Sequence, residues 1–153
     1  MTSLSFNDIF DNFLGSITDY NIASLDKKDA YVLMSEYLYK TLSQSYIRRL
    51  FSTLSIDKDM EIISFEMKTV VDETADTDFV IGVLTKGMVV EWLKPQVRSK
   101  VNIAQMFGGK EAKWFSQAQH ITELRAMLED AQLELKKEIR DRGYIYNSYL
   151  EES

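Results

Sequence analysis

The sequence of 153 residues contains no cysteine, one proline and one histidine. Without thiols it can form no disulfide, no thiolate nucleophile and no cysteine-ligated zinc site. One histidine supplies only one imidazole acid–base group, and it cannot form a metal centre that requires several histidine ligands. The formal net charge of −6 gives the chain no overall positive field with which to hold nucleic acid phosphates. Thiol chemistry is therefore excluded, and general nucleic acid binding is disfavoured.

Long apolar runs are also lacking. The longest, residues 79–93, is interrupted by Lys86 and Glu91 and predicts no membrane span. Residues 1–8 have neither the basic start nor the apolar core of a secretory signal. The composition is otherwise that of a folded protein, with 45% hydrophobic and 27% charged residues. We expect a protein of the cytosol or of a soluble assembly, with a single helical domain over residues 1–142.

Hydrophobic periodicity predicts helices in the first third of the chain. Apolar residues recur at three-and-four spacing over 6–17, behind Ser5, whose hydroxyl can cap the helix. A second helix is expected to begin after Asp26 and to run to about Thr41. Residues 43–51 can add another turn or two of helix.

The middle of the chain has a different pattern. Polar residues predict a turn over 55–59. Beyond it, within 60–71, Ile63, Phe65 and Met67 alternate with polar residues, which is the period-two pattern of a half-buried strand. A helix also fits this segment, so a short β element near residues 60–71 is one of two predictions there.

A helix with a wide apolar face is predicted from residue 79 onward, and Gly82 and Gly87 allow it to pack closely against other backbone. Pro95 should end or kink this helix, because proline lacks an amide donor and crowds the preceding turn. A loop is expected to follow and to end at Gly108 and Gly109. We expect this segment to be the core helix.

The final helix is predicted over residues 115–142, ending at Gly143. One face carries an apolar stripe, made up of Phe115, Ala118, Ile121, Leu124, Leu128, Ala131, Leu135 and Ile139. The helical rise predicts a length of about 42 Å, whereas a compact domain of this size is about 38 Å across. The helix either overhangs its own domain or forms the full-length spine of an elongated bundle.

No set of residues predicts catalysis. His120 and Glu123 are neighbours on one helix face, but two ligands are too few for zinc, and a di-iron bundle would need a second such pair. The acidic residues within 72–78 lack the spacing and the central glycine of a calcium-binding loop, and helix capping explains them. Residues 108–110 lack the spaced glycines of a phosphate loop and predict a turn. We therefore expect no enzyme activity, no metal and no cofactor.

The segment after Gly143 is unusually aromatic for the end of a domain. Ordering seven of its residues costs about 7 to 14 kcal/mol of backbone entropy, and burying five of its side chains returns about 7 to 15 kcal/mol. Contact with a neighbouring surface or strand edge would make the net free energy of ordering favourable. We therefore expect residues 143–153 to be a docking tail. Packing of this segment on its own domain is the alternative. The residues expected to bind a partner are Tyr144, Ile145, Tyr146, Tyr149 and Leu150.

Charge is unevenly distributed along the chain. Residues 57–78 contain eight acidic residues and two lysines, while residues 86–113 contain six basic residues and two acidic ones. In a head-to-tail contact the acidic region of one copy can face the basic region of the next, and such contacts close into rings when the rotation permits. Two solvated faces on a monomer are the alternative.

Several motifs in the C-terminal half resemble small head-to-tail connector proteins of long-tailed bacteriophages. They are DFVI at 78–81, EWLKP at 91–95 and MFGGK at 106–110, followed by a long helix and RGY at 142–144. The resemblance implies a helical adaptor that forms a dodecameric ring beneath the capsid portal and extends the DNA channel. It also implies a C-terminal segment that docks on the portal, contacts with adjacent neck or tail proteins, and DNA that passes without sequence-specific binding. No catalytic residue is carried over.

These features together predict a mainly α fold: a small helical bundle with a long C-terminal helix, a short β element near 60–71 and an extended C-terminal tail. The expected function is that of a virion structural protein in the neck between head and tail, present in the host cytoplasm during assembly and not associated with a membrane. Another virion component, such as a tail-completion or decoration protein, and a cellular helical protein-interaction module are the alternatives.

Overall fold

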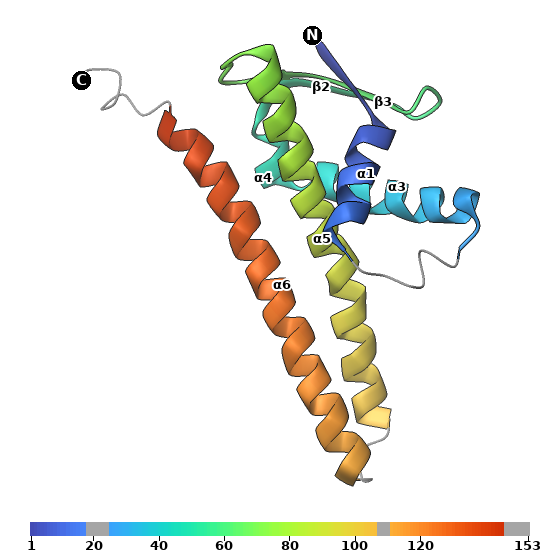
Figure 1. Ribbon diagram of the computed structural model, residues 1–153. Helices are drawn as coiled ribbons and strands as arrows, with labels where there is room; N and C mark the ends of the chain where they lie inside the picture. Colours follow the sequence, from blue (N-terminus) through green and yellow to red (C-terminus); the bar gives the residue numbers. More distant parts are fainter. Residues whose placement is uncertain (18–24, 107–110, 146–153) are drawn as a thin grey trace.

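A computed structural model gives the structure of the protein. It describes the backbone of residues 1–17, 25–106 and 111–145, and the side chains of 1–17, 25–99 and 120–142. Two long helices, α5 (Glu73–Met106) and α6 (Glu111–Ile145), run antiparallel side by side as a hairpin. The other elements gather around one end of this hairpin (Figure 1). The predicted mainly α fold is confirmed.

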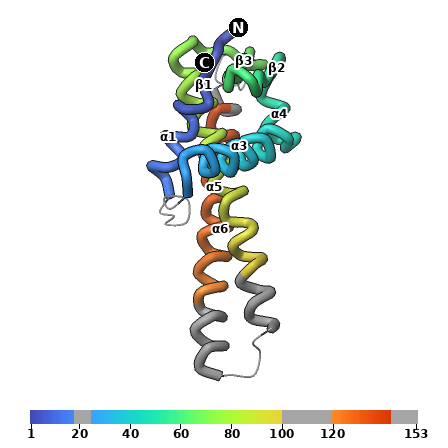
Figure 2. The backbone as a smooth tube through the Cα atoms, turned by 90° about the vertical axis from the view of Figure 1, so that its right-hand side faces the viewer, coloured from blue at the N-terminus to red at the C-terminus, as the bar shows by residue number. Residues whose placement is uncertain are grey.

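The elements at that end of the hairpin form a head. In chain order they are β1 (Thr2–Ser5), α1 (Phe6–Ser16), α3 (Lys27–Ser43), α4 (Ser45–Arg48), β2 (Phe51–Asp57) and β3 (Ile62–Met67). Figure 2 shows α3 crossing the two long helices, whose described parts continue beyond it. The helices predicted in the first third of the chain are therefore present. The Ser5 hydroxyl caps α1, accepting a hydrogen bond from the Asp8 amide at 3.4 Å, whereas Asp26 takes the N-cap position of α3 without a side-chain cap.

The three strands form one antiparallel sheet in the order β1-β3-β2. The strand predicted near 60–71 is confirmed as β3, with Ile63, Phe65 and Met67 buried, and the helical alternative is wrong. The turn predicted over 55–59 begins too early, because residues 55–57 pair with β3 and the chain reverses only over 58–61. Glu61 in that turn has φ of 58°, a conformation that β2 and β3 impose on a non-glycine residue. β1 was not predicted, since four residues at a sheet edge carry almost no periodic signal.

The core lies between α1, the sheet and α5. The inward face of α1 is fully buried, with Ile9 and Phe13 at 0% exposure, and α5 contributes Val80, Val83, Leu84 and Met88 at the same value. On α1 the apolar stripe was predicted one residue too wide, since Leu14 is 43% exposed. Burial of aromatic and aliphatic side chains from all layers stabilises the head, at roughly 1.5 to 3 kcal/mol for each large side chain.

The two glycines predicted to allow close packing against other backbone instead lie against side chains of two neighbouring helices. A Cβ atom at Gly87 would lie 2.2 Å from Cγ2 of Thr41 on α3, so only glycine permits this crossing of α3 over α5. A Cβ atom at Gly82 would meet the carboxylate of Glu138 on α6. That carboxylate forms an ion pair with Lys86, one turn along α5 from Gly82.

Pro95 neither ends α5 nor begins a loop. The helix continues through it to Met106, so the prediction of a loop between residues 95 and 109 is wrong as far as residue 106, and residues 107–110 lie outside the described chain. An internal proline costs a helix about 3 kcal/mol through a lost hydrogen bond and a steric clash. The buried residues Trp92 and Leu93 just before it hold the helix against its neighbours and offset that cost.

Helix α6 is longer at both ends than predicted. It extends from Glu111 to Ile145 and passes through Gly143, so the predicted end at that glycine is wrong. Glycine within a helix costs only about 1 kcal/mol relative to alanine, which does not by itself terminate a helix. The apolar stripe is present, with Leu124, Ala131 and Leu135 buried. Its 35 residues span about 52 Å.

Asp72 caps the N-terminus of α5, where the Ala75 amide donates to its carboxylate at 2.7 Å. Replacing Asp72 with alanine should lower the free energy of unfolding by about 1 kcal/mol, because one amide of the first turn loses its acceptor. Asp78, exposed on the same helix and without a capping role, is the matched control, and Asp78→Ala should change stability by less than about 0.5 kcal/mol. Urea denaturation measures both, and equal effects would show that the cap contributes nothing.

Candidate interaction surfaces

The described part of the chain contains no group of three or more residues of the kinds that bind metals. His120 lies on the surface of α6, with its side chain 52% exposed and Nδ1 3.9 Å from a carboxylate oxygen of Glu123. None of the described helices is both long enough and apolar enough to cross a bilayer. The candidate sites are therefore surfaces and hollows.

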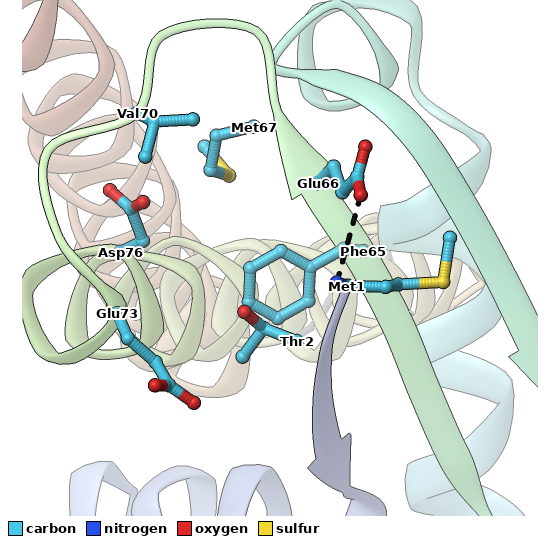
Figure 3. Close-up of a pocket in the computed structure, with 8 residues that line it drawn as sticks. All are labelled: Met1, Thr2, Phe65, Glu66, Met67, Val70, Glu73 and Asp76. Carbon is cyan, nitrogen blue, oxygen red and sulfur yellow. Dashed lines mark ion pairs between the residues drawn. The ribbon is translucent and has the colours of Figure 1, made fainter.

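An acidic pocket of about 520 Å³ opens between the edge of the sheet and the start of α5 (Figure 3). Its lining residues are Met1, Thr2, Phe65, Glu66, Met67, Val70, Glu73 and Asp76. Figure 3 shows the Phe65 ring at its centre, between the start of β1 and the first turns of α5.

Most of the acidity of this pocket is neutralised within the molecule. The Glu66 carboxylate lies 3.6 Å from the amino group of Met1 and accepts a hydrogen bond from the Thr53 hydroxyl. Asp76 is only 5% exposed and pairs with Arg142. Among the described residues, Glu73 is the one pocket carboxylate without an ion pair. Glu73 therefore remains available within the pocket, and seven of the eight acidic residues over 57–78 stay exposed.

Arg142 fixes the end of α6 to the head. It is 8% exposed, and its Nη2 donates to Asp76 at 2.6 Å and to the Thr69 carbonyl at 2.8 Å. Its guanidinium lies over the ring of Phe79, 4.3 Å from the centroid, which adds a cation–π attraction. Asp76 also accepts from the Val71 amide at 3.2 Å. This pair joins residues that are 66 positions apart. It holds the last turns of α6 against the start of α5.

A second hollow, of about 430 Å³, lies where α4 meets α5 and α6. It is lined by Gln44, Tyr46, Val90, Lys94, Gln132, Leu135, Lys136, Ile139 and Arg140. Its floor is apolar, since Val90 and Leu135 are each 2% exposed. Burial raises the pKa of Tyr46 on its wall, and nearby Lys94 offsets part of that rise. The Tyr46 hydroxyl therefore stays protonated and neutral.

An adjoining hollow of about 440 Å³ shares Gln44 and Lys94 with this 430 Å³ hollow. It adds Lys40, Pro95 and Arg98 among its lining residues. We call the two hollows together the cationic groove. Its lining includes five cationic residues, Lys40, Lys94, Arg98, Lys136 and Arg140. Its one lining acid is Glu91, which is 7% exposed and pairs with Lys94 at 3.0 Å. The groove therefore combines an apolar floor with a positively charged rim.

The residues expected to bind a partner fall at the limit of the described chain. Tyr144 and Ile145 are the last residues of α6 and not part of an extended segment, so the predicted extended conformation is wrong for these two. Tyr146, Tyr149 and Leu150 lie outside the described residues.

The cationic groove was not identified from the sequence. Its walls come from three segments, near residues 39–46, 90–98 and 132–140. The excess of basic residues over 86–113 was the one signal that indicated it, and this excess includes Lys94 and Arg98. The contribution of α6 became visible only when the hairpin placed Lys136 and Arg140 beside α5.

Comparisons with protein-family models, with curated proteins and with solved structures returned no significant match.

Proposed function

We propose that this protein is a virion structural component, a ring-forming adaptor that joins the portal of the capsid to the tail and extends the DNA channel. The motifs at 78–81, 91–95 and 106–110 support this proposal through their resemblance to phage connector proteins. No reaction is part of the proposed role. The chain acts through its contacts with other copies and with neighbouring virion proteins.

The observation that carries the proposal is the α5–α6 hairpin. Each helix is about 50 Å long, and the head surrounds only one end of the pair (Figures 1 and 2). A paired helical rod of this kind can lie beside identical rods and form the wall of a tube. The elements packed at one end of each hairpin then provide contacts at one end of that tube. A compact bundle offers no such geometry.

A ring also requires two different surfaces on each copy, because a contact that uses the same patch on both partners closes as a dimer. The cationic groove and the exposed acidic residues over 57–78 are two such surfaces of opposite character. The net charge of −6 is compatible with DNA passing through the ring, because a wall that is not strongly basic does not retain phosphates.

Electron microscopy of the purified full-length protein, alone and mixed with a candidate portal, tests the proposal. Rings, or copies arranged around the portal, are expected. Copies bound only to tail or capsid surfaces would replace the connector with a tail-completion or decoration role. A monodisperse monomer or dimer that binds no virion protein would overturn the virion role and favour a cellular interaction module.

A further inference from the structure

We propose that the cationic groove of one copy receives the C-terminal segment, residues 146–153, of a neighbouring copy. This inference deepens the proposed function and rests on it. The segment that occupies the groove belongs to a second copy of the chain, so docking requires self-association. It assigns to the end of the chain a binding site within the ring itself, made by α3, α4, α5 and α6.

The groove and the segment are complementary in chemistry. The segment reads Tyr-Asn-Ser-Tyr-Leu-Glu-Glu-Ser and contains two acidic residues and no basic one. Tyr149 and Leu150 supply apolar side chains for the floor formed by Val90, Leu135 and Ile139. Glu151 and Glu152 follow directly, where the cations of the rim can pair with them.

The acidic pocket does not suit this segment. Its unpaired carboxylate, Glu73, would lie close to Glu151 and Glu152, and like charges in a partly enclosed hollow repel. The outer faces of α6 do not suit it either, because exposed apolar residues such as Met127 and Leu133 line none of the hollows described above. Of the described hollows, the groove alone pairs apolar contacts with positive charge.

The length of the chain favours the groove of a neighbour over that of the same copy. Helix α6 ends at Ile145, and Leu135 on the floor lies about 15 Å back along the same helix. A segment that returns to its own groove must first reverse direction, which uses about four residues. Tyr149 and Leu150 would then lie at or near the turn, beside Ile139 at the near end of the floor and short of Leu135. A neighbouring copy can present the segment without that reversal.

The absence of native cysteine makes disulfide trapping a direct test in the full-length protein. Gln132→Cys places a thiol in the groove and Ser148→Cys places one beside Tyr149, so that both anchoring side chains remain. When the two variants are mixed and oxidised, a covalent dimer with a 132–148 disulfide is expected, as identified by mass spectrometry. The matched control is Leu133→Cys, whose site is 63% exposed and outside the groove, and we expect at least about ten times less cross-linking.

Charge reversal tests whether the rim recognises the acidic residues. Adding Lys136→Glu and Arg140→Glu to the Gln132→Cys variant should reduce cross-linking at least about tenfold. Adding Glu151→Lys and Glu152→Lys to the Ser148→Cys variant should restore it, because the charges are complementary again. Circular dichroism of each variant checks that it is folded. Restoration by the second pair of changes cannot arise from damage caused by the first, and its absence would overturn the electrostatic part of the inference.

The outcomes separate this inference from the proposed function. Rings that form without a 132–148 disulfide would overturn groove docking and leave the adaptor role in place. The disulfide in small oligomers that never form rings or bind a portal would support groove docking and count against the adaptor. If the Gln132→Cys/Ser148→Cys double variant closes the bond within one chain while the mixture gives no dimer, the segment occupies its own groove and the proposal of a neighbour is wrong.

Discussion

Replacing Arg142 with alanine should lower the free energy of unfolding by about 3 to 5 kcal/mol, since it leaves the Asp76 carboxylate buried without its partner. Asp76 would keep one hydrogen bond, from the Val71 amide, and lose the guanidinium 2.6 Å away. The Thr69 carbonyl would lose its donor as well. Guanidinium chloride denaturation with an unchanged m-value measures the loss.

The matched control is Arg140→Ala, two residues earlier on the same helix. Arg140 is 66% exposed and pairs with Asp141, which is 3.9 Å away and also exposed, so the change should stay within about 0.5 kcal/mol. Equal losses in the two variants would show that the buried pair does not hold α6 to the head.

A double replacement distinguishes the charge from the packing. Arg142→Met preserves much of the side chain over Phe79, and Asp76→Ala removes the carboxylate that would otherwise be stranded. Because removing both partners of a buried pair costs much less than removing one, the double variant should be more stable than Arg142→Ala by about 2 kcal/mol. If it is equally unstable, the stranded Asp76 carboxylate is not what destabilises Arg142→Ala.

Gly87→Ala should destabilise the protein by about 1 to 3 kcal/mol, although alanine is the better helix former by about 1 kcal/mol. The new methyl group would lie 2.2 Å from Cγ2 of Thr41. Thr41 cannot easily move away, because it is 1% exposed and its hydroxyl donates to the Tyr37 carbonyl at 2.9 Å. The crossing of α3 over α5 must therefore open. Thermal and denaturant unfolding measure the effect.

Two further variants make this prediction specific. Gly15→Ala on α1 has no neighbouring atom within 4 Å of the new methyl group, so it should leave stability unchanged or raise it by up to about 1 kcal/mol. Thr41→Ser removes the clashing methyl group and retains the hydroxyl, and it should recover part of the loss when combined with Gly87→Ala. A stable Gly87→Ala variant, or one that Thr41→Ser does not improve, would contradict the proposed close contact.

The positions of the helices followed from local patterns. Ser5, Asp26 and the apolar repeats of the segments behind them indicated α1 and α3, because capping and periodicity depend on residues a few positions apart. The alternation over Ile63, Phe65 and Met67 indicated β3 for the same reason. Two local signals were nevertheless overridden, at Pro95 and Gly143. Each costs a few kcal/mol at most, and the packing of a long helix against its neighbours exceeds that cost.

The interaction surfaces depended on contacts that the sequence does not display. Val90 and Leu135 form one floor only because α5 and α6 are antiparallel at a particular register, and the rim combines charges from three separate segments. In the same way, Asp76 of the acidic stretch over 57–78 is buried against Arg142 and closed to a partner, whereas the other seven acids are exposed. Charge counted along a chain does not distinguish a solvated carboxylate from a paired one.

The absence of cysteine determined by itself that the chain lacks thiol chemistry. The helical periodicity determined that the chain folds mainly as helices. Both conclusions depend on which residues are present and on their near neighbours. Only the tertiary structure decided that two helices form a rod beyond the head, that Arg142 is buried and that a cationic groove exists. These features arise from residues far apart in the chain, such as Asp76 and Arg142, which are separated by 66 positions, and the packing that joins them is a property of the whole fold.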